Sequence, residues 1–409
     1  MIYPRKILYL QHAGALGGSC MSLLYTMQGL DRLRFEPVVA LARPSTELVE
    51  FYNSAGFKVL PWKGMMLWDH STVAPKPLYD PRSWVHLGHV WLRWSTTQRN
   101  MLELIDTIKP DLVHLNSMPL SACAQILNRH GIPFVWHIRE PPPDQGLRTR
   151  MIRRIMMQAP RLIFLSEYDR QAWVNGYAGD IVHNFVDLET FSRVMGGRLV
   201  RKKMDLAQED KVILFLGGKA LANGIFVLLK ALSVLQNQIS NLVCLMPGAS
   251  SIPAASWQGR VARKLLPMLG SGTLIQKIEK GIREKKIESI VRLLPFSRNI
   301  PELLAACDLL VVPATRPHFA RPVIEAAAMG KACIGSNLGG VNELIEPGRT
   351  GLLVEPGSPS ALAGAIKELL TDSEKLKIMG KNAYKKACDD FGAKKQIAKI
   401  MNIYDTILS

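Results

Sequence analysis

The chain has 409 residues, more than one ordinary core holds, and its length predicts two domains of roughly 200 residues each. Its 51 Lys and Arg residues exceed its 34 Asp and Glu residues, giving a formal net charge of +17. This excess favours anionic partners such as phosphates or an acidic membrane surface. No run of 18 apolar residues occurs, and the first residues lack the apolar core of a signal peptide. We therefore expect a cytoplasmic protein without a membrane span.

Short β-rich runs alternate with helical patterns along the chain. The predicted strands are, in chain order, Lys6–Gln11, Pro37–Leu41, Asp111–Leu115, Phe134–Ile138, Arg161–Leu165, Lys211–Leu216, Leu242–Met246, Ile290–Leu294, Asp308–Val312 and Ala332–Gly335. Apolar strands separated by helices are typical of α/β proteins with parallel sheets covered on both faces. The polar stretch 191–210 interrupts this alternation, and we interpret it as a linker between one doubly wound domain at 1–190 and another at 211–385.

The segment 386–409 has a different pattern. Its apolar residues follow the spacing of one helical face, and no strand follows. The residues of this stripe are Ile397, Ile400, Met401, Tyr404 and Ile407. We expect a helix that packs back on the N-terminal domain.

Each domain has a glycine-rich turn after its first strand. Gly17 and Gly18 precede a helical run in the first domain, and Gly218, Lys219 and Asn223 lie in the corresponding turn of the second. Glycine between a parallel strand and a helix lets a phosphate approach the backbone at the positive end of the helix dipole. A tight βα turn without a ligand is the alternative for each turn alone.

The most specific motif is PHFARPVIEAAAMGK at 317–331, followed by GSNLGGVNEL at 335–344. Together with PDLVH at 110–114, VWHIRE at 135–140 and NFVD at 184–187, it resembles the signature of glycosyltransferase family 4. The resemblance implies the GT-B fold, in which two Rossmann-like domains face each other across a cleft. It also implies retaining transfer of a sugar from a nucleotide-sugar donor to a glycan, lipid-linked or small-molecule acceptor, as in surface polysaccharide biosynthesis.

The resemblance assigns roles on the donor side. Glu325 matches the family's ribose-binding glutamate, and a carboxylate early in a helix can accept two ribose hydroxyls. The amides of Ala320 and Arg321, at the start of the same helix, suit a diphosphate. A helix-dipole partner without a ligand is the structural alternative for Glu325.

The resemblance also assigns residues to the acceptor side. His137 matches the family's active-site histidine and lies at the end of a predicted parallel strand, where open α/β sheets bind ligands. Arg139 and Glu140 follow it directly and either bind the acceptor or pair with each other.

Three positions depart from the family pattern. Pro317 replaces the first glutamate of the E-x7-E motif, and Gly218 and Asn223 replace the usual diphosphate-binding Arg and Lys. Lys219 and Arg321 are cations that can compensate. No D-x-D pair occurs, so we expect neither a metal nor another cofactor. An altered donor and a lost activity both remain open.

Two segments have the pattern of a membrane surface. Four arginines alternate with apolar residues at 148–157, and Trp84, Leu87, Trp91 and Trp94 share one helical face. Both stripes can equally pack inside the first domain. No nucleic-acid-binding module is recognisable, so we do not expect a nucleic-acid partner.

Two other functions fit the departures. A non-catalytic GT-B protein would bind a glycan or a partner enzyme through a degenerate donor site. A nucleotide-sugar epimerase shares the fold, but the C-terminal signature resembles that of the transferases.

Overall fold

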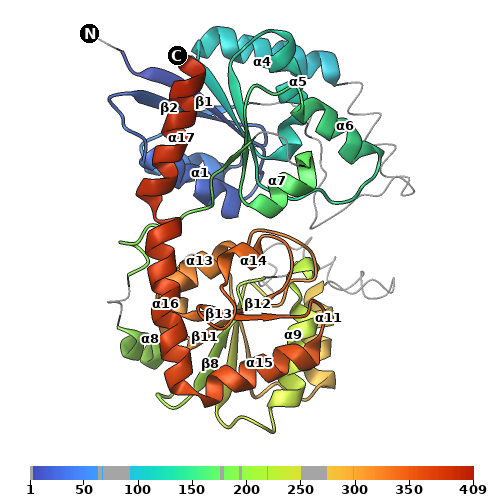
Figure 1. The fold of residues 1–409 in the computed structure, drawn as a ribbon, viewed down its shortest axis with the longest axis vertical. Helices are drawn as coiled ribbons and strands as arrows, with labels where there is room; N and C mark the ends of the chain where they lie inside the picture. The colour runs from blue at the N-terminus through green and yellow to red at the C-terminus, as the bar shows by residue number, and fades with distance from the viewer. Residues whose placement is uncertain are drawn as a thin grey trace. The chain divides into compact units, whose positions relative to one another are not determined.

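The computed structural model describes residues 3–62, 67, 93–175, 179–192, 196–218, 220–249, 274–297 and 299–409. The chain divides into two compact units. The first contains Met1–Phe185 and Phe391–Ser409, and the second contains Val186–Asp390 (Figure 1).

The first unit is built on a seven-stranded parallel sheet with the order β3-β2-β1-β4-β5-β6-β7. Its strands are β1 (Arg5–Gln11), β2 (Phe35–Leu41), β3 (Lys58–Pro61), β4 (Leu112–Asn116), β5 (Phe134–Ile138), β6 (Leu162–Phe164) and β7 (Asp180–Ile181). The order reverses at β1 and β4, which is the switch point where doubly wound folds bind ligands.

Helices cover both faces of this sheet. One face packs against α4 (Trp94–Ile108), α5 (Ser121–Arg129), α6 (Leu147–Met156) and α7 (Glu167–Val174). The other face packs against α1 (Gly18–Gln28), α2 (Thr46–Ser54) and α17 (Ala393–Leu408). A short 3₁₀ helix, η1 (Met118–Leu120), follows β4.

Helix α17 lies beside α1 and β1 in the first unit, although it is far from both in sequence (Figure 1). Ile397, Ile400 and Tyr404 of its apolar stripe are buried. Gly29 at the end of α1 leaves the space that the Ile397 side chain fills, since a Cβ there would overlap that side chain. The C-terminal stripe thus completes the core of the N-terminal unit.

The second unit contains a six-stranded parallel sheet with the order β10-β9-β8-β11-β12-β13. Its strands are β8 (Lys211–Leu214), β9 (Leu242–Pro247), β10 (Val291–Leu294), β11 (Leu309–Val312), β12 (Ala332–Ser336) and β13 (Gly351–Val354). Its helices are α8 (Gly197–Lys203), η2 (Leu221–Asn223), α9 (Ile225–Leu235), α11 (Leu274–Glu284), α12 (Ile300–Ala306), α13 (Arg321–Ala328), α14 (Val341–Leu344), α15 (Pro359–Thr371) and α16 (Ser373–Phe391).

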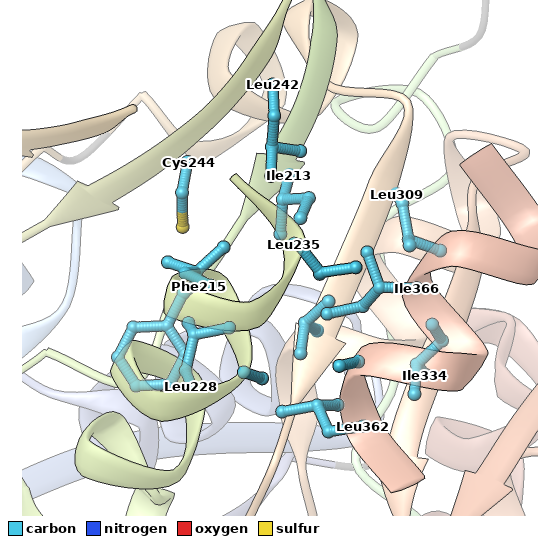
Figure 2. Packing of buried hydrophobic residues seen from close by; sticks show 14 of the residues in the cluster. Ile213, Phe215, Leu228, Leu235, Leu242, Cys244, Leu309, Ile334, Leu362 and Ile366 are labelled. Atoms are coloured by element: carbon cyan, nitrogen blue, oxygen red, sulfur yellow. The ribbon is translucent and has the colours of Figure 1, made fainter. Parts of the chain in front are cut away.

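The core of the second unit lies between this sheet and α9, α11 and α15. Figure 2 shows how Ile213, Leu309 and Ile334 from three neighbouring strands meet Leu362 and Ile366 of α15. This core leaves the loops at the carboxyl ends of the strands free to carry functional side chains.

The ten predicted strands are all present, and their ends differ from the prediction by no more than two residues. The sequence did not predict β3, β7 and β13 as strands. β7 has only two residues, too few to produce an alternating pattern. Among the described residues, no helix is both long and apolar enough to cross a membrane.

The segment 191–210 is not an open linker, because it contains α8, which packs against α12. Arg201 of α8 donates from Nη2 to the carboxylate of Asp308 at 2.8 Å and from Nε to the carbonyl oxygen of Ala306 at 3.0 Å. These bonds, one buried and one partly buried, attach the polar segment to the second unit, which its local charge pattern does not indicate.

Candidate active site

The turn after β8 is stabilised by one of its own side chains. Asn223 donates from Nδ2 to the carbonyl oxygen of Gly217 at 2.7 Å. Gly224 has φ +79° and lies directly against Pro313, whose carbonyl oxygen a Cβ would overlap. Gly218 has φ +54°, and a Cβ built on it would meet no described residue within 4 Å. Asn223 therefore shapes this turn, while Gly218 leaves room for a ligand. Lys219 lies outside the described residues.

Helix α13 carries a nearly buried ion pair. Arg321 donates from Nε to Oε1 of Glu325 at 2.7 Å, and their side chains are only 12% and 10% exposed. Burial raises the pKa of Glu325, and the nearby Arg321 cation opposes that rise. The backbone amide of Arg321 already donates to the carbonyl oxygen of Phe319 at 3.1 Å. Ala320 caps the helix without a side-chain hydrogen bond.

The loops that follow β11 and β12 contact each other beside this helix. Gly339 has φ +62°, and a Cβ at this position would lie 2.8 Å from the Cβ of Pro317. His318 lies beside them, with its Nδ1 3.2 Å from the carbonyl oxygen of Arg316. Burial lowers the pKa of His318, so its ring is neutral near pH 7. Pro317, at a position where the family motif has glutamate, thus packs against a glycine turn.

An exposed aromatic ring lies at the same edge of the sheet. Phe296 follows β10 and is 65% exposed. A Cβ on Gly248, which follows β9, would lie 3.9 Å from both the Phe296 ring and the Cα of Gly218. Phe296 was not predicted from the sequence, although an aromatic residue two positions beyond the end of a parallel strand is a recognisable signal. The ring stands where a flat ligand can stack.

In the first unit, Gly17 and Gly18 begin α1. Among the residues that the structure describes, a Cβ on either glycine would meet nothing within 4 Å. Neither glycine has a positive φ, and no acidic side chain lies in the first turn. Phosphate binding here stays a prediction.

Arg139 holds the carboxyl ends of β4 and β5 together. Its Nε donates to Oδ1 of Asn116, and its Nη1 donates to Oδ1 of Asn184 at 3.0 Å. Asn184 also accepts from the hydroxyl of Ser22 at 2.9 Å. The guanidinium is partly exposed, and amide oxygens accept both of these bonds. It is thus oriented at the carboxyl ends of β4 and β5.

Glu140 is held next to Arg139 through Ser117. The Ser117 hydroxyl lies 2.6 Å from both carboxylate oxygens of Glu140. Ser117 has φ +104°, a backbone conformation that is strained for a non-glycine residue, and such strain concentrates at functional sites. Trp173 donates from Nε1 to the carbonyl oxygen of Glu140 at 2.6 Å, which further fixes this loop.

His137 lies beneath this edge, in the buried layer. It is 2% exposed, and its Nε2 atom is buried without a hydrogen-bond partner among the described residues. Burial lowers its pKa well below the usual value, with further contributions from Arg139 and His114. The structure therefore brings His137, Arg139 and Glu140 together, with His137 inside the core and the other two at the edge.

The comparisons with known proteins agree with this architecture. A model described as glycosyl transferases group 1 matches residues 198–386, and one described as glycosyltransferase family 4 matches residues 16–190. Among solved structures, HepE of Anabaena in complex with UDP superposes with a TM-score of 0.77 at 19% identity, covering 98% of this chain and 100% of that one. Sucrose-phosphate synthase from Thermosynechococcus elongatus superposes with a TM-score of 0.74 at 18% identity, covering 98% and 99%.

The curated relatives are also glycosyltransferases. N-acetyl-alpha-D-glucosaminyl L-malate synthase of Bacillus anthracis is 33% identical over 36% of this chain and 39% of its own length. The UDP-Gal:alpha-D-GlcNAc-diphosphoundecaprenol alpha-1,3-galactosyltransferase of Escherichia coli is 22% identical over 75% of this chain and 78% of its own length. D-inositol 3-phosphate glycosyltransferase of Streptomyces avermitilis is 27% identical over 60% of this chain and 52% of its own length. The match to the first and third thus spans about half of their length or less.

The two units are both Rossmann-like, each with a parallel sheet, and together they have the GT-B fold. The two family models together span most of the sequence, and the chain is a GT-B glycosyltransferase of the family 4 type.

Proposed function

We propose that the chain transfers a sugar from a nucleotide-sugar donor, with retention of the anomeric configuration. The observation that carries this proposal is the nearly buried Arg321–Glu325 pair, which follows β11 at the same carboxyl edge of the second sheet as the turn at Gly218. It sets an oriented carboxylate and a cation at one edge of the second sheet, as binding a ribose and a diphosphate requires. The UDP complex of the structurally similar HepE supports a nucleotide donor.

Each donor group has a partner at this edge. Glu325 accepts hydrogen bonds from the ribose hydroxyls, and Arg321 supplies positive charge to the diphosphate in place of the cations missing at Gly218 and Asn223. Phe296 stacks on the nucleobase. Because these groups supply the charge that the departing diphosphate needs, we propose that the reaction needs no metal ion.

The chemistry is a front-face substitution at the anomeric carbon. The bond from this carbon to the diphosphate oxygen breaks, and the bond to the acceptor oxygen forms on the same face. The acceptor proton passes to the departing diphosphate oxygen, so no protein base is consumed. Arg139 and Glu140 bind the acceptor hydroxyls, and His137 supports the sugar-binding edge from the buried layer.

We propose a glycan, lipid-linked or small-molecule acceptor. The Escherichia coli relative, whose printed activity uses a diphosphoundecaprenol-linked sugar, supports a lipid-linked acceptor. Such an acceptor places the enzyme on the inner face of a membrane, in the assembly of a surface polysaccharide.

Helix α6 supplies a surface for this membrane contact. Leu147, Met151 and Met157 on and beside it are 63%, 49% and 43% exposed, and Arg150 and Arg154 are exposed between them. Ile152 and Met156 are buried on the opposite side. No acidic residue lies in the helix. An apolar face with interleaved arginines suits the interface of an anionic bilayer.

Of the other candidate membrane stripe, only Trp94 lies among the described residues. Trp84, Leu87 and Trp91 lie outside the described residues. Trp94 packs partly buried against the core of the first unit, with the Arg129 guanidinium 5.4 Å from its ring centre. Trp94 is therefore a packing residue.

Vesicle flotation tests the membrane contact. We expect the protein to float with anionic vesicles and not with neutral ones, and Arg150→Glu/Arg154→Glu to abolish flotation. Lys280→Glu/Lys377→Glu changes the net charge equally at exposed positions of the second unit and should still float. Equal loss in both variants would show attraction to the whole protein and contradict a face on α6.

The transferase activity is tested by binding and by product analysis. Calorimetry against a panel of nucleoside diphosphates and their sugars should detect one preferred donor. Glu325→Gln should no longer bind this donor, whereas Glu374→Gln, at an exposed position, should bind it normally. Nuclear magnetic resonance of the product then gives its anomeric configuration, and an inverted product would contradict retention. Activity that disappears with EDTA and returns with a divalent cation would contradict metal independence.

A second function is favoured by Pro317, Gly218 and Asn223, which depart from the donor-binding pattern. A non-catalytic protein of this fold would bind a glycan or a partner enzyme. It would respond to no nucleotide in the panel, whereas an epimerase would change the donor sugar without any acceptor.

A further inference from the structure

A row of polar side chains lies on the sheet face that α17 covers. Tyr9 of β1 stands opposite His114 of β4, and Asn116 of β4 stands opposite His137 of β5. Residues two apart in a strand point to the same face, so His114 and Asn116 share one face, which is also the face of His137 and of Arg139 beyond it. The row therefore runs from the middle of the sheet to its carboxyl edge.

Helix α17 enters this row through Tyr404. Its hydroxyl lies 2.8 Å from the hydroxyl of Tyr9 and 2.6 Å from Nδ1 of His114. All three side chains are buried. The ring of Tyr404 also meets the ring of His114 edge-on, with 5.9 Å between their centres. Tyr404 thus holds the orientation of the His114 ring.

The row continues from His114 to the edge. The rings of His114 and His137 are 5.5 Å apart between centres. Nη2 of Arg139 lies 3.5 Å from Nδ1 of His137, and the same guanidinium binds the amide oxygens of Asn116 and Asn184. A rotation of either histidine ring therefore changes the surroundings of Arg139.

Stability alone does not account for this row. The Nε2 atoms of His114 and His137 are both buried without a hydrogen-bond partner among the described residues. A buried polar atom without a partner destabilises the folded state, and apolar side chains of the same size would avoid that cost. The row is better explained by the geometry that it imposes on Arg139.

We propose that Tyr404 is a positioning residue that sets the orientation of Arg139 through His114 and His137. The docked C-terminal segment thereby determines the geometry of the predicted acceptor edge. This inference rests on the proposed transferase function for its kinetic consequence, but not for its structural one.

Two single hydroxyl deletions in the full-length protein test the proposal. Tyr404→Phe removes the hydroxyl that binds His114, whereas Tyr9→Phe removes its neighbour and leaves the Tyr404–His114 bond in place. The protein is labelled with ¹⁵N at arginine and histidine, and the signals of the Arg139 Nε–H and the His137 ring are recorded. His114→Gln breaks the same row one residue further along and serves if Tyr404→Phe does not fold.

We expect Tyr404→Phe to shift both signals and Tyr9→Phe to leave them unchanged, although both variants lower the thermal midpoint to a similar extent. The transfer kcat should fall about tenfold in Tyr404→Phe, with the donor KM unchanged. Unshifted signals in Tyr404→Phe, or equal shifts in both variants, would overturn the positioning role. If the wild type transfers no sugar, the spectra still decide this question, so that the two failures are distinct.

Discussion

Arg321 and Glu325 form an ion pair one helical turn apart in α13, with 2.7 Å between Nε and Oε1 and with both side chains nearly buried. Such a pair contributes little net stability, because removing two charges from water offsets most of their attraction. Its value lies in holding a carboxylate and a cation at fixed positions, which is what a nucleotide site requires.

Arg321→Met should destabilise the protein by roughly 3 kcal/mol, because it leaves the Glu325 carboxylate buried without its cation. Arg321→Met/Glu325→Leu should recover most of that loss, since no buried charge remains. Urea denaturation measures both, and calorimetry should find no nucleotide binding in the stable double variant. Normal nucleotide affinity in the double variant would mean that the Arg321–Glu325 pair does not bind the donor.

Phe296→Ala should weaken nucleotide binding by about 1–3 kcal/mol, the usual contribution of one stacked base. The free energy of unfolding should stay unchanged, because the ring is mostly exposed. Phe296→Tyr keeps the aromatic face and should bind normally. Calorimetry with a nucleoside diphosphate measures the effect, and equal affinities for Ala and Phe would place the base elsewhere.

Gly224→Ala should destabilise the protein by about 2 kcal/mol or more, because φ is +79° and the new Cβ would overlap the carbonyl oxygen of Pro313. Gly18→Ala is the matched control, since its Cβ meets nothing and the helix gains a better former. Thermal unfolding should separate the two variants in opposite directions. A stable Gly224→Ala protein would contradict the close approach of this turn to Pro313.

The stability should fall as the pH decreases from about 6.5 to about 3, in part because of His114. Burial lowers the pKa of His114 to about 3, with a smaller contribution from Arg139. Between these pH values the unfolded state therefore binds a proton that the folded state does not. The contribution of the neutral His114 ring to the free energy of unfolding is complete above pH 6.5 and is lost as the pH decreases. In this range, His114 lowers the free energy of unfolding by about 1.4 kcal/mol for each unit of decrease in pH.

His114→Gln should reduce this slope, because glutamine does not titrate. Urea denaturation at several pH values from 4 to 7 gives the comparison. The same slope in both proteins would mean that His114 titrates normally in the folded state.

The sequence predicted ten of the strands well, because parallel strands that are buried on both faces are continuous apolar runs. It did not predict α8, since the buried partners of Arg201 lie about a hundred residues away at Ala306 and Asp308. A local pattern of arginines and lysines looks the same whether or not such partners exist.

The site was predicted in part for a similar reason. Motif position identified the segments around Glu325 and His137, but not which way each side chain points. Only the structure shows that His137 is buried within the sheet while Arg139 lies on the same face beyond the end of β5. Phe296 was missed because exposure at a strand end depends on the neighbouring loops.

The division of the first unit into residues 1–185 and 391–409 has a consequence for synthesis on the ribosome. The first sheet is translated early, yet the face formed by β1 and α1 stays uncovered until α17 has left the exit tunnel. The second unit has all its residues by then and can fold first. The N-terminal unit is therefore completed last, and a message interrupted before residue 391 yields a chain with an uncovered apolar face that chaperones can bind.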